Sequence, residues 1–293
     1  MKRNQLLPQP DFIPEFVQWE GFEGSSIGIT GQKGLLGGVL YKRISKSGIS
    51  IKAYPGDILD NEKLESWFRE KQFSHFLHFA AVVPLVEVEK DPLKAFEANA
   101  IGVFNIIKQI KKTQKGCWVF TTSSSHIYEP SGISPILYLT ENSKSDPSNF
   151  YGESKRVGEL IAQYLLEELS ISYCIGRLFS FTHYNQKEPY LVPTLIRKIN
   201  MLKNGEILHL INPESVRDII DIESVVDAIL HLAVKKCKGV INIGSGKGLS
   251  VRQIAELLIK KFNRNLIITG VNKSEPDSLV SDVQKLRKTL QSI

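Results

Sequence analysis

Short apolar segments alternate with amphipathic ones through the first two thirds of the chain. The apolar runs are rich in β-branched and aromatic side chains, which predicts buried strands. Between them, apolar residues recur at spacings of three and four, which predicts helices that pack by one face. The predicted strands are residues 26–30, 49–54, 75–80, 117–122 and 172–177, and the predicted helices are residues 35–45, 61–71, 92–112 and 151–169. This alternation is typical of an α/β fold of the Rossmann type, a doubly wound parallel sheet with helices on both faces.

The regular alternation weakens after residue 177. Helices are expected at residues 192–203, 222–234 and 250–262, with a strand at residues 239–243. We therefore expect a smaller, mixed α/β lobe over the carboxyl edge of the sheet. The expected domains are residues 26–176 and residues 177–293.

Residues 1–25 follow neither the helical nor the strand period. Pro8, Pro10 and Pro14 interrupt this segment, and it contains no apolar stretch like that of a secretory signal. We expect an N-terminal extension that either packs on the surface or stays partly ordered.

The composition is that of a folded globular protein, with 42% hydrophobic and 23% charged residues in a chain of 293. No apolar run approaches the roughly 20 residues that a membrane-spanning helix needs. The three cysteines, Cys117, Cys174 and Cys237, are far apart and form no CxxC pair. This spacing favours a reducing compartment without a disulfide framework or a metal site. A cytoplasmic protein without a membrane partner is therefore expected.

The net charge of +6 is compatible with an anionic partner. The basic residues are scattered or gather at short helix ends, and no basic motif interleaved with aromatic residues is present. Surface solvation, or a basic site for an anionic small molecule, explains the charge better than nucleic-acid binding does.

A glycine-rich turn, TGQKGLLG at residues 30–37, follows the first predicted strand and opens the first helix. Gly31 permits a tight turn, Gly34 lets a pyrophosphate approach the backbone, and Gly37 lets helix and strand pack closely. The unpaired N–H groups of the helix N-terminus face such phosphates. A glycine-rich turn without a ligand has the same pattern, so this motif alone leaves the function open.

Two further motifs carry candidate chemistry. Tyr151 and Lys155 lie four residues apart at the start of a helix and therefore share one face. A nearby ammonium favours the phenolate, so we expect Lys155 to lower the pKa of Tyr151. The segment TTSSSHIY at residues 121–128 ends a predicted strand, where parallel sheets bind their ligands. Taken singly, a surface helix and a Ser/Thr turn explain these motifs as well.

Together and in this order, the motifs resemble the extended short-chain dehydrogenase/reductase (SDR) family, the NAD(P)-dependent nucleotide-sugar epimerases, dehydratases and reductases. The resemblance covers roughly residues 26–290. The matching segments are TGxxGxxG at residues 30–37, DILD at residues 57–60, HFAA at residues 78–81, Asn99, YGESK at residues 151–155, VRDIID at residues 216–221, and NIGSG at residues 242–246 followed by LSV at residues 249–251.

The resemblance implies roles for individual residues. Tyr151 is expected to be the catalytic acid/base, Lys155 its electrostatic partner and a ligand of the coenzyme ribose, and Ser124 a hydrogen-bond partner of the reacting oxygen. The coenzyme is expected to meet Gly31, Gln32, Lys33, Gly34, Leu35, Leu36, Asp57, Ile58, Phe79, Ala80, Ala81, Asn99, Tyr151 and Lys155. The substrate is expected to meet Ser124, Ser125, His126, Ser180 and Arg217, whose forked guanidinium suits a pyrophosphate. No metal is expected.

One departure from the family pattern concerns the coenzyme. The second predicted strand ends in IKAYP at residues 51–55, without a carboxylate. An acid there bonds the 2′-hydroxyl of NAD and repels the 2′-phosphate of NADP. Its absence favours NADP(H) slightly over NAD(H). Lys33 and Lys52 are candidate contacts of a 2′-phosphate, or simply solvated lysines.

A second departure concerns the substrate. The family's sugar dehydratases carry Asp-Glu directly after the catalytic serine or threonine, whereas this chain has Ser125 and His126. Without those carboxylates, dehydration is excluded. His126 is a candidate for proton transfer, or a histidine that bonds nearby backbone. Ser180 stands where many relatives have asparagine, so family contacts in residues 180–190 are not transferred.

We therefore expect an NAD(P)-dependent oxidoreductase, in which residues 26–176 bind the dinucleotide and residues 177–293 bind a nucleotide sugar. The preferred hypothesis is reduction at C4 of a nucleotide-linked 4-keto-6-deoxyhexose, with Ser124 polarising the carbonyl and Tyr151 protonating the alkoxide. A 4-epimerase with tightly bound NAD uses the same residues and stays open. The alternative of another class is a non-catalytic dinucleotide-binding regulatory protein, against which the complete set of Ser124, Tyr151 and Lys155 argues. The resemblance also implies a homodimer through the helices at residues 92–112 and 151–169.

Overall fold

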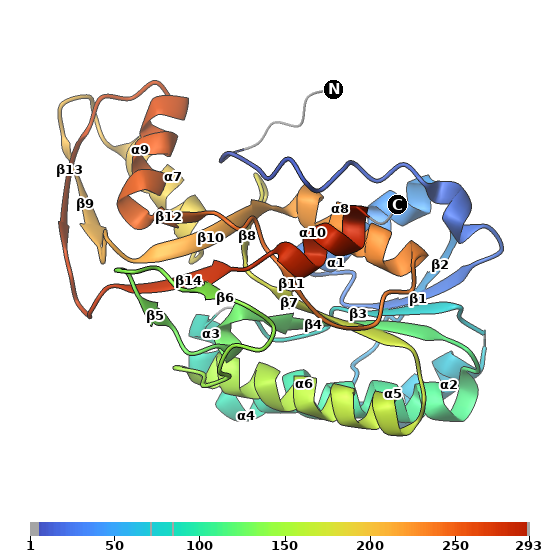
Figure 1. The fold of residues 1–293 in the computed structure, drawn as a ribbon. Helices are drawn as coiled ribbons and strands as arrows, with labels where there is room; N and C mark the ends of the chain where they lie inside the picture. The colour runs from blue at the N-terminus through green and yellow to red at the C-terminus, as the bar shows by residue number, and fades with distance from the viewer. Residues whose placement is uncertain (1–5, 71, 84, 292–293) are drawn as a thin grey trace.

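A six-stranded parallel sheet forms the centre of the molecule, as the strand pattern predicts (Figure 1). The computed structural model describes residues 6–70, 72–83 and 85–291; the expectations for residues 1–5, residue 71 and residues 292–293 lie outside this range. Across the sheet the strands follow the order β2 (Ser50–Ala53), β1 (Ser26–Thr30), β3 (His75–His78), β4 (Trp118–Ser124), β7 (Tyr173–Leu178) and β11 (Gly239–Ile243). The predicted Rossmann-type fold is confirmed.

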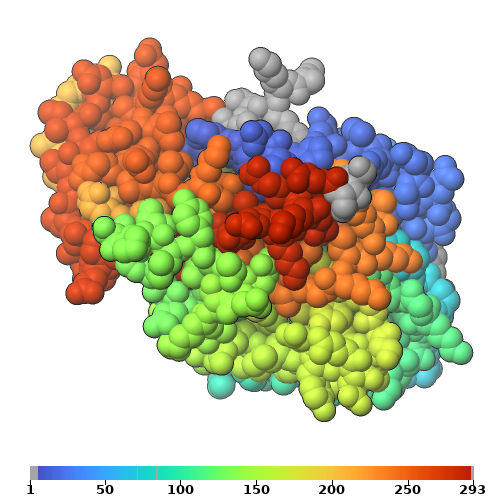
Figure 2. Space-filling model, in the orientation of Figure 1, coloured from blue at the N-terminus to red at the C-terminus, as the bar shows by residue number. Residues whose placement is uncertain are grey.

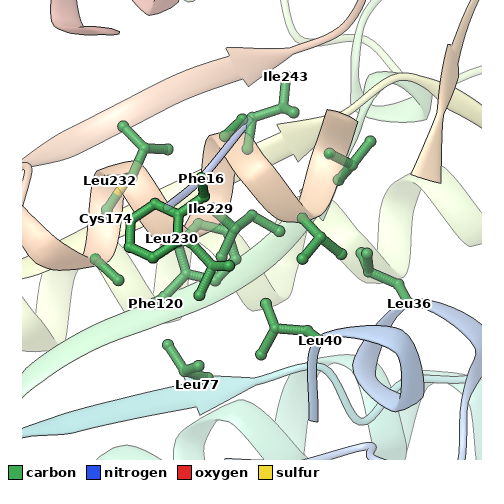
Figure 3. Close-up of a cluster of buried hydrophobic side chains, with 14 of the residues drawn as sticks. Phe16, Leu36, Leu40, Leu77, Phe120, Cys174, Ile229, Leu230, Leu232 and Ile243 are labelled. Carbon is green, nitrogen blue, oxygen red and sulfur yellow. The ribbon is translucent and has the colours of Figure 1, made fainter. Parts of the chain in front are cut away.

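Helices cover both faces of this sheet. One face carries α1 (Leu35–Lys46), α8 (Ile222–Val234) and α10 (Gln284–Gln291), and the other carries α2 (Asn61–Arg69), α5 (Gly102–Thr113) and α6 (Phe150–Glu168) (Figure 1). Leu40 of α1 and Ile229 of α8 pack against Leu77 and Phe120 of the strands (Figure 3). Because the inner strands are covered on both sides, they read as continuous apolar runs in the sequence.

The edge of the sheet beyond β1 is short. The usual dinucleotide-binding order places two strands there, whereas among the described residues only β2 lies beyond β1. At the opposite edge, β11 pairs in parallel with β7 although it follows the small lobe in the sequence. The chain therefore leaves the central sheet after β7 and returns to it with α8, β11 and α10.

The long helix expected at residues 92–112 forms one continuous helical rod, within which the helix type changes. It consists of α4 (Pro92–Phe96), a π-helical turn η2 (Glu97–Ile101) and α5. A Cβ on Gly158 of α6 would lie 2.2 Å from the backbone oxygen of Asn99 in that turn. The two helices thus meet at backbone distance at the π turn. A short helix that the sequence pattern did not predict, α3 (Leu85–Lys90), precedes the rod.

A smaller lobe stands at the carboxyl edge of the central sheet (Figure 1). It consists of a four-stranded sheet with two strands attached, a two-stranded parallel sheet and two helices. The strands of the first sheet are β12 (Gly248–Ser250), β10 (Val216–Asp221), β14 (Asp277–Ser281) and β5 (Ser131–Gly132), with β6 (Tyr138–Leu139) and β8 (Ser180–Thr182) attached, and the remaining elements are β9 (Ile207–Ile211), β13 (Ile267–Val271), α7 (Leu191–Met201) and α9 (Val251–Lys261).

The N-terminal segment is packed along its described length, from residue 6 through the short helix η1 (Trp19–Phe22). Leu6 and Leu7 are buried in the core of the small lobe, and Phe16 and Phe22 are buried in the core beside the central sheet. Figure 2 shows the segment, in blue, running from the small lobe along the top of the molecule. It therefore contributes to the cores of both lobes.

Candidate active site

The turn after β1 brings three backbone segments into close contact. Gly31 has a positive φ of 76°, and a Cβ on it would lie 2.4 Å from the carbonyl carbon of Phe79 at the end of β3. A Cβ on Gly37 would lie 2.4 Å from the backbone oxygen of Gly31. Only glycine fits at both positions, so the turn can stay narrow. Gly34 caps α1 without a side-chain hydrogen bond, which leaves N–H groups at the start of the helix available to an anion.

A cavity of about 130 Å³ opens at this turn. Its lining residues are Thr30, Gly31, Gln32, Lys33, Tyr54, Pro55, Gly56, Ile58 and Ala80. Five of the residues expected at the coenzyme are among them, and the lining contains no carboxylate. A phosphate at the start of α1 with a ribose beside Tyr54 and Pro55 fits this cavity, so the described residues suit a dinucleotide.

Other residues expected at the coenzyme surround this cavity. Leu36 is buried and Leu35 half-buried in the core beneath the turn. The carboxylate of Asp57 accepts a hydrogen bond from the backbone N–H of Leu59, at the exposed start of the loop into α2. Phe79 packs on Phe120, and only its backbone faces Gly31. Contact of these side chains with a coenzyme stays a prediction.

The side chain of Asn99 supports the loop after β3. Its Oδ1 accepts from the backbone N–H of Val82, and its Nδ2 donates to the backbone oxygen of Val82 and to Ser154 Oγ. Asn99 is buried, and the loop that it holds contains Ala81. The geometry thus favours a role in shaping the coenzyme site, whereas direct contact of Asn99 with the coenzyme stays a prediction.

Ser124, Tyr151 and Lys155 converge at the carboxyl end of β4. Ser124 is the last residue of β4, and its Oγ accepts from the backbone N–H of His126 in the turn η3 (Ser125–Ile127). Tyr151 and Lys155 lie one turn apart at the start of α6, and both are buried. The side chain of Ser124 is near enough to the Tyr151 phenol to lower its pKa. The structure thus brings together the three residues expected to be catalytic.

Burial shifts the pKa values of Tyr151 and Lys155. It raises the pKa of Tyr151 to about 12, with the nearby phenol of Tyr190 raising it further and Ser124 opposing the change. It lowers the pKa of Lys155 to about 8, against the opposing effect of Glu159. The expected lowering of the Tyr151 pKa by Lys155 is therefore wrong for this state of the chain, because desolvation of the phenol is the largest influence on that pKa and Lys155 is not among the groups that shift it.

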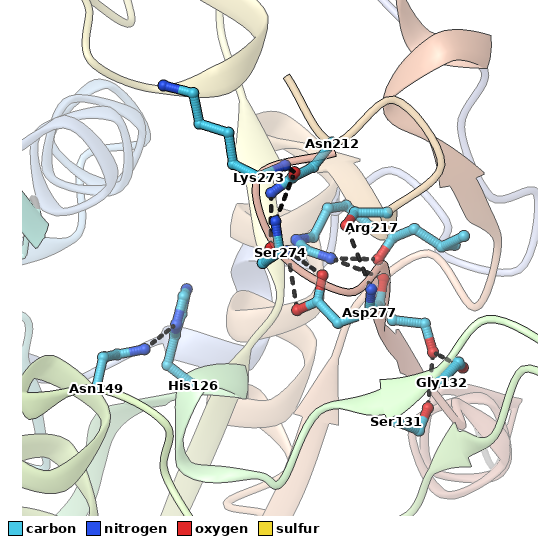
Figure 4. A network of polar contacts seen from close by, with 12 residues as sticks. His126, Ser131, Gly132, Asn149, Asn212, Arg217, Lys273, Ser274 and Asp277 are labelled. Carbon is cyan, nitrogen blue, oxygen red and sulfur yellow. Dashed lines mark hydrogen bonds and ion pairs between the residues drawn. The ribbon is translucent and has the colours of Figure 1, made fainter. Parts of the chain in front are cut away.

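His126 lies beside Tyr151, and their rings meet edge to face at a centroid distance of 5.5 Å. Its Nδ1 is 3.2 Å from Nδ2 of Asn149, the residue that caps α6 (Figure 4). Burial, together with the charge of Arg217, lowers the pKa of His126 to about 4. The imidazole is therefore neutral at pH 7.

Arg217 reaches this region from the small lobe. Its Nη2 bonds both carboxylate oxygens of Asp277, at 2.9 and 3.1 Å, and the pair is partly exposed (Figure 4). Arg217 and Asp277 both affect the pKa of His126, so the two lobes face each other here. The guanidinium remains accessible to an anionic ligand, although Asp277 already neutralises part of its charge.

The remaining residues expected at the substrate differ in exposure. Ser125 is buried in η3, and Ser180 is exposed at the start of β8, which pairs with β10.

Sequence reasoning missed Tyr190, whose phenol is near enough to Tyr151 to raise its pKa. Tyr190 precedes α7 as its N-cap residue in a loop without a recognisable motif. Sequence reasoning also missed Asn149, although an asparagine directly before a predicted helix is a recognised N-cap signal.

A family model described as the NAD dependent epimerase/dehydratase family matches residues 27–244. The chain belongs to this family. It is accordingly an NAD(P)-dependent enzyme of the extended SDR type, an epimerase or a reductase. The N-terminal segment before residue 27 lies outside the match.

Several curated relatives share this family. The UDP-glucose 4-epimerase of Mycoplasma genitalium is 28% identical over 268 residues, which cover 83% of this chain and 77% of the relative. The UDP-glucose 4-epimerase of Lactobacillus helveticus is 27% identical over 259 residues, which cover 82% of this chain and 77% of the relative.

Solved structures of similar fold include a Thermus thermophilus UDP-glucose 4-epimerase in complex with NAD. It has a TM-score of 0.78 and 19% identity, and the match covers 90% of this chain and 92% of that structure. RMD from Pseudomonas aeruginosa, complexed with NADPH, has a TM-score of 0.80 and 20% identity, and the match covers 91% and 92%. These likenesses support the family's fold.

Among the described residues, no helix is long and apolar enough to cross a membrane. In the same part of the chain, no cluster of three or more His, Cys, Asp or Glu side chains is arranged to hold a metal ion.

Proposed function

We propose that this enzyme is a nucleotide-sugar 4-epimerase and that UDP-glucose is a substrate. The observation that carries the proposal is that relatives named UDP-glucose 4-epimerase match more than four fifths of the chain. The convergence of Ser124, Tyr151 and Lys155 at one strand end supports it. This function corresponds to the alternative considered from the sequence and takes precedence over the keto-reductase.

In this proposal, the coenzyme pyrophosphate lies on the turn at Gly31 and the N-terminus of α1, and Lys155 binds the ribose. The coenzyme, when bound, supplies reversible hydride transfer at the sugar C4. Tyr151 takes the proton of the C4 hydroxyl and later returns it, and Ser124 hydrogen-bonds the same oxygen. Arg217 meets the pyrophosphate of the nucleotide sugar from the small lobe.

The coenzyme expected for an epimerase is NAD that stays bound, because each catalytic cycle regenerates it. The lining of the cavity at the turn contains Lys33 and no carboxylate, so it does not select against a 2′-phosphate. That observation favours the keto-reductase as a second candidate, since a reductase draws on exchangeable NADPH. The two functions differ in whether the coenzyme leaves the protein.

The test is incubation of the purified chain with UDP-glucose and NAD, with the C4 epimer measured by NMR. An epimerase converts UDP-glucose to an equilibrium mixture without net formation of NADH. Tyr151→Phe is expected to lower the rate by roughly 10³-fold while the coenzyme still binds. A chain that leaves UDP-glucose unchanged but oxidises NADPH with a nucleotide-linked 4-keto sugar is a reductase instead.

We also propose that the enzyme is a homodimer through α5 and α6. Leu160 and Tyr164 lie one turn apart on α6 and are 55% and 67% exposed, and Phe104 of the neighbouring α5 is 41% exposed. Exposed apolar side chains gathered on adjacent helices favour a covered surface. Light scattering is expected to give twice the chain mass of 33.0 kDa. The double variant Leu160→Glu, Tyr164→Glu is expected to give the monomer, and a wild-type monomer would contradict the proposal.

A further inference from the structure

Asn149 caps the helix that carries Tyr151 and Lys155, and this role fixes the orientation of its amide. Its Oδ1 accepts a hydrogen bond of 2.9 Å from the backbone N–H of Gly152, as an N-cap side chain does. A backbone N–H can only donate, so the oxygen of the amide must face Gly152. The nitrogen of the amide then faces His126, 3.2 Å from its Nδ1 (Figure 4).

The orientation of Asn149 in turn fixes the tautomer of His126. An amide nitrogen only donates, so Nδ1 of His126 must accept with its lone pair and carries no proton. A neutral imidazole then has its proton on Nε2. The low pKa of His126, caused by burial and by Arg217, agrees with a neutral ring. Within the described residues, no hydrogen-bond partner is assigned to Nε2.

The second nitrogen lies on the side of the ring away from Asn149, and Figure 4 shows this arrangement. The ring packs edge to face against Tyr151, and the charged groups near it are Arg217 and Asp277 of the small lobe. His126 also follows Ser124 by two residues. The Nε2–H group therefore points away from Asn149, on a ring that lies beside the reacting tyrosine and near Arg217 and Asp277 of the small lobe.

We propose that His126 is a neutral hydrogen-bond donor to the sugar, held in the Nε2–H tautomer by Asn149. The identity of the ligand, a nucleotide sugar, rests on the proposed function. A group that can only donate a hydrogen bond favours a sugar with a hydroxyl, carbonyl or carboxylate oxygen on a carbon near the reacting C4. It discriminates against a sugar that lacks this oxygen. His126 thus orients the substrate, a role different from the proton transfer considered from the sequence alone.

The tautomer can be measured in the coenzyme-free chain by ¹⁵N–¹H NMR of the imidazole groups. The signals of His126 are identified by their loss in His126→Gln. We expect a protonated Nε2 and an unprotonated Nδ1 from pH 8 to pH 5.5. A proton on Nδ1, or a ring that becomes charged in this range, overturns the proposal whether or not the chain is an epimerase.

The role toward the sugar is tested by adding UDP-glucose to the same sample. We expect the Nε2–H proton resonance to shift as UDP-glucose binds, and UDP alone to shift it less. Binding of UDP-glucose without any change at Nε2–H overturns the donor role. Failure of UDP-glucose to bind at all counts against the proposed function, and the tautomer result then decides the state of His126 by itself.

Asn149→Asp is the sharpest variant because aspartate caps a helix as well as asparagine does. Its carboxylate accepts a hydrogen bond from Nδ1–H, so the single proton of the neutral ring moves from Nε2 to Nδ1. The negative charge of the carboxylate also raises the pKa of the ring. A donor at Nε2 then exists only while the ring is charged. We expect kcat/KM to fall about tenfold as the pH rises through the pKa of that ring, whereas the wild type has no such step.

Asn149→Ser is the matched control, since serine keeps the cap but has no group that reaches His126. It is expected to leave the unfolding midpoint close to that of the wild type and to produce no pH step. His126→Ala is expected to raise KM for UDP-glucose by about tenfold, with a smaller change in kcat. Equal pH profiles for Asn149→Asp and Asn149→Ser would contradict the positioning role of Asn149.

Discussion

Tyr151 and Lys155 share one face of α6, and burial acts on them in opposite directions. It raises the pKa of the phenol to about 12 and lowers that of the ammonium to about 8. In both cases the charged form loses hydration that the protein does not replace. In the coenzyme-free chain the phenol therefore holds its proton at pH 7, so its role as a base requires that bound coenzyme and substrate lower this pKa. The charge of Lys155 depends on pH near 8.

Coenzyme affinity is expected to depend on this lysine. Below pH 8 the ammonium is charged and can donate to the ribose hydroxyls, and above pH 8 it loses that charge. The dissociation constant of the coenzyme should therefore rise as the pH rises from 7 to 9.5, a range in which Tyr151 of the coenzyme-free chain stays neutral. Calorimetric titration with NAD at several pH values measures this, and Lys155→Met should remove the dependence. The same slope in both proteins would contradict the role of Lys155.

The residues of the site that were predictable are those with local signals. Gly31, Ser124, Tyr151 and Lys155 stand in short motifs whose spacing is set by one turn or one helix, so the sequence contains the geometry. Tyr190 comes to Tyr151 through the fold of a long loop that carries no local pattern. For such residues, the contact exists only after the two lobes have packed.

At the level of elements, the periodicity predicted the central strands and helices, and the departures have physical causes. The rod from α4 to α5 contains the π turn η2, where backbone contact with Gly158 replaces side-chain packing. The role of β11 was not predictable, because an apolar strand does not specify which sheet it joins. Its pairing with β7 is set by the crossover through the small lobe.

A buried ion pair joins α6 to the central sheet. Arg177 of β7 bonds Glu159 of α6 at 2.6 Å, and their side chains are 10% and 5% exposed. Arg177 also donates to the hydroxyl of Tyr128 and to the backbone oxygen of Glu141. The pair therefore sits within a hydrogen-bonded network between elements that frame the site.

Removal of one partner should leave an uncompensated buried charge. Glu159→Gln is expected to lower the free energy of unfolding by about 3 to 5 kcal/mol, measured by urea denaturation. Glu153→Gln on the same helix is the control, because Glu153 is 45% exposed and its distance to Arg156 is 3.8 Å. That variant should cost less than about 1 kcal/mol. Similar costs for the two variants would contradict a structural role for the buried pair.

At the scale of the whole molecule, the N-terminal segment packs against both lobes. Residues 6–22 lie outside the family match yet contribute to both cores. His231 of α8 lies 3.3 Å from the backbone oxygen of Pro14 in that segment. The sequence showed aromatic residues there without a period, so their burial was not predictable before the surface that receives them was known.

Stability is expected to decrease with acidification. Burial lowers the pKa of His75 to about 4 and that of His78 to about 3, against 6.5 for an exposed imidazole. The unfolded chain therefore binds more protons than the folded one below pH 6.5, so unfolding becomes easier as the pH falls. Between pH 6 and 5 the two histidines should cost about 2 to 3 kcal/mol per pH unit.

Urea denaturation at pH 7.5, 6 and 5 measures this loss in a range above the titration of ordinary carboxyl groups. His75→Gln should reduce the slope by about 1 kcal/mol per pH unit if it folds, since one proton uptake is removed while those of His78 and His126 remain. A free energy of unfolding that does not change between pH 6 and 5 would contradict the neutral, buried state of these histidines.

Regeneration of the coenzyme within each catalytic cycle distinguishes the proposed 4-epimerase from the keto-reductase. The most direct test is to denature the freshly purified protein and identify the dinucleotide that it releases, with its amount per chain. The 4-epimerase predicts NAD at close to one molecule per chain, because a regenerated coenzyme has no need to leave. A protein that is purified empty and then binds and releases NADPH reversibly would contradict the epimerase and favour the keto-reductase.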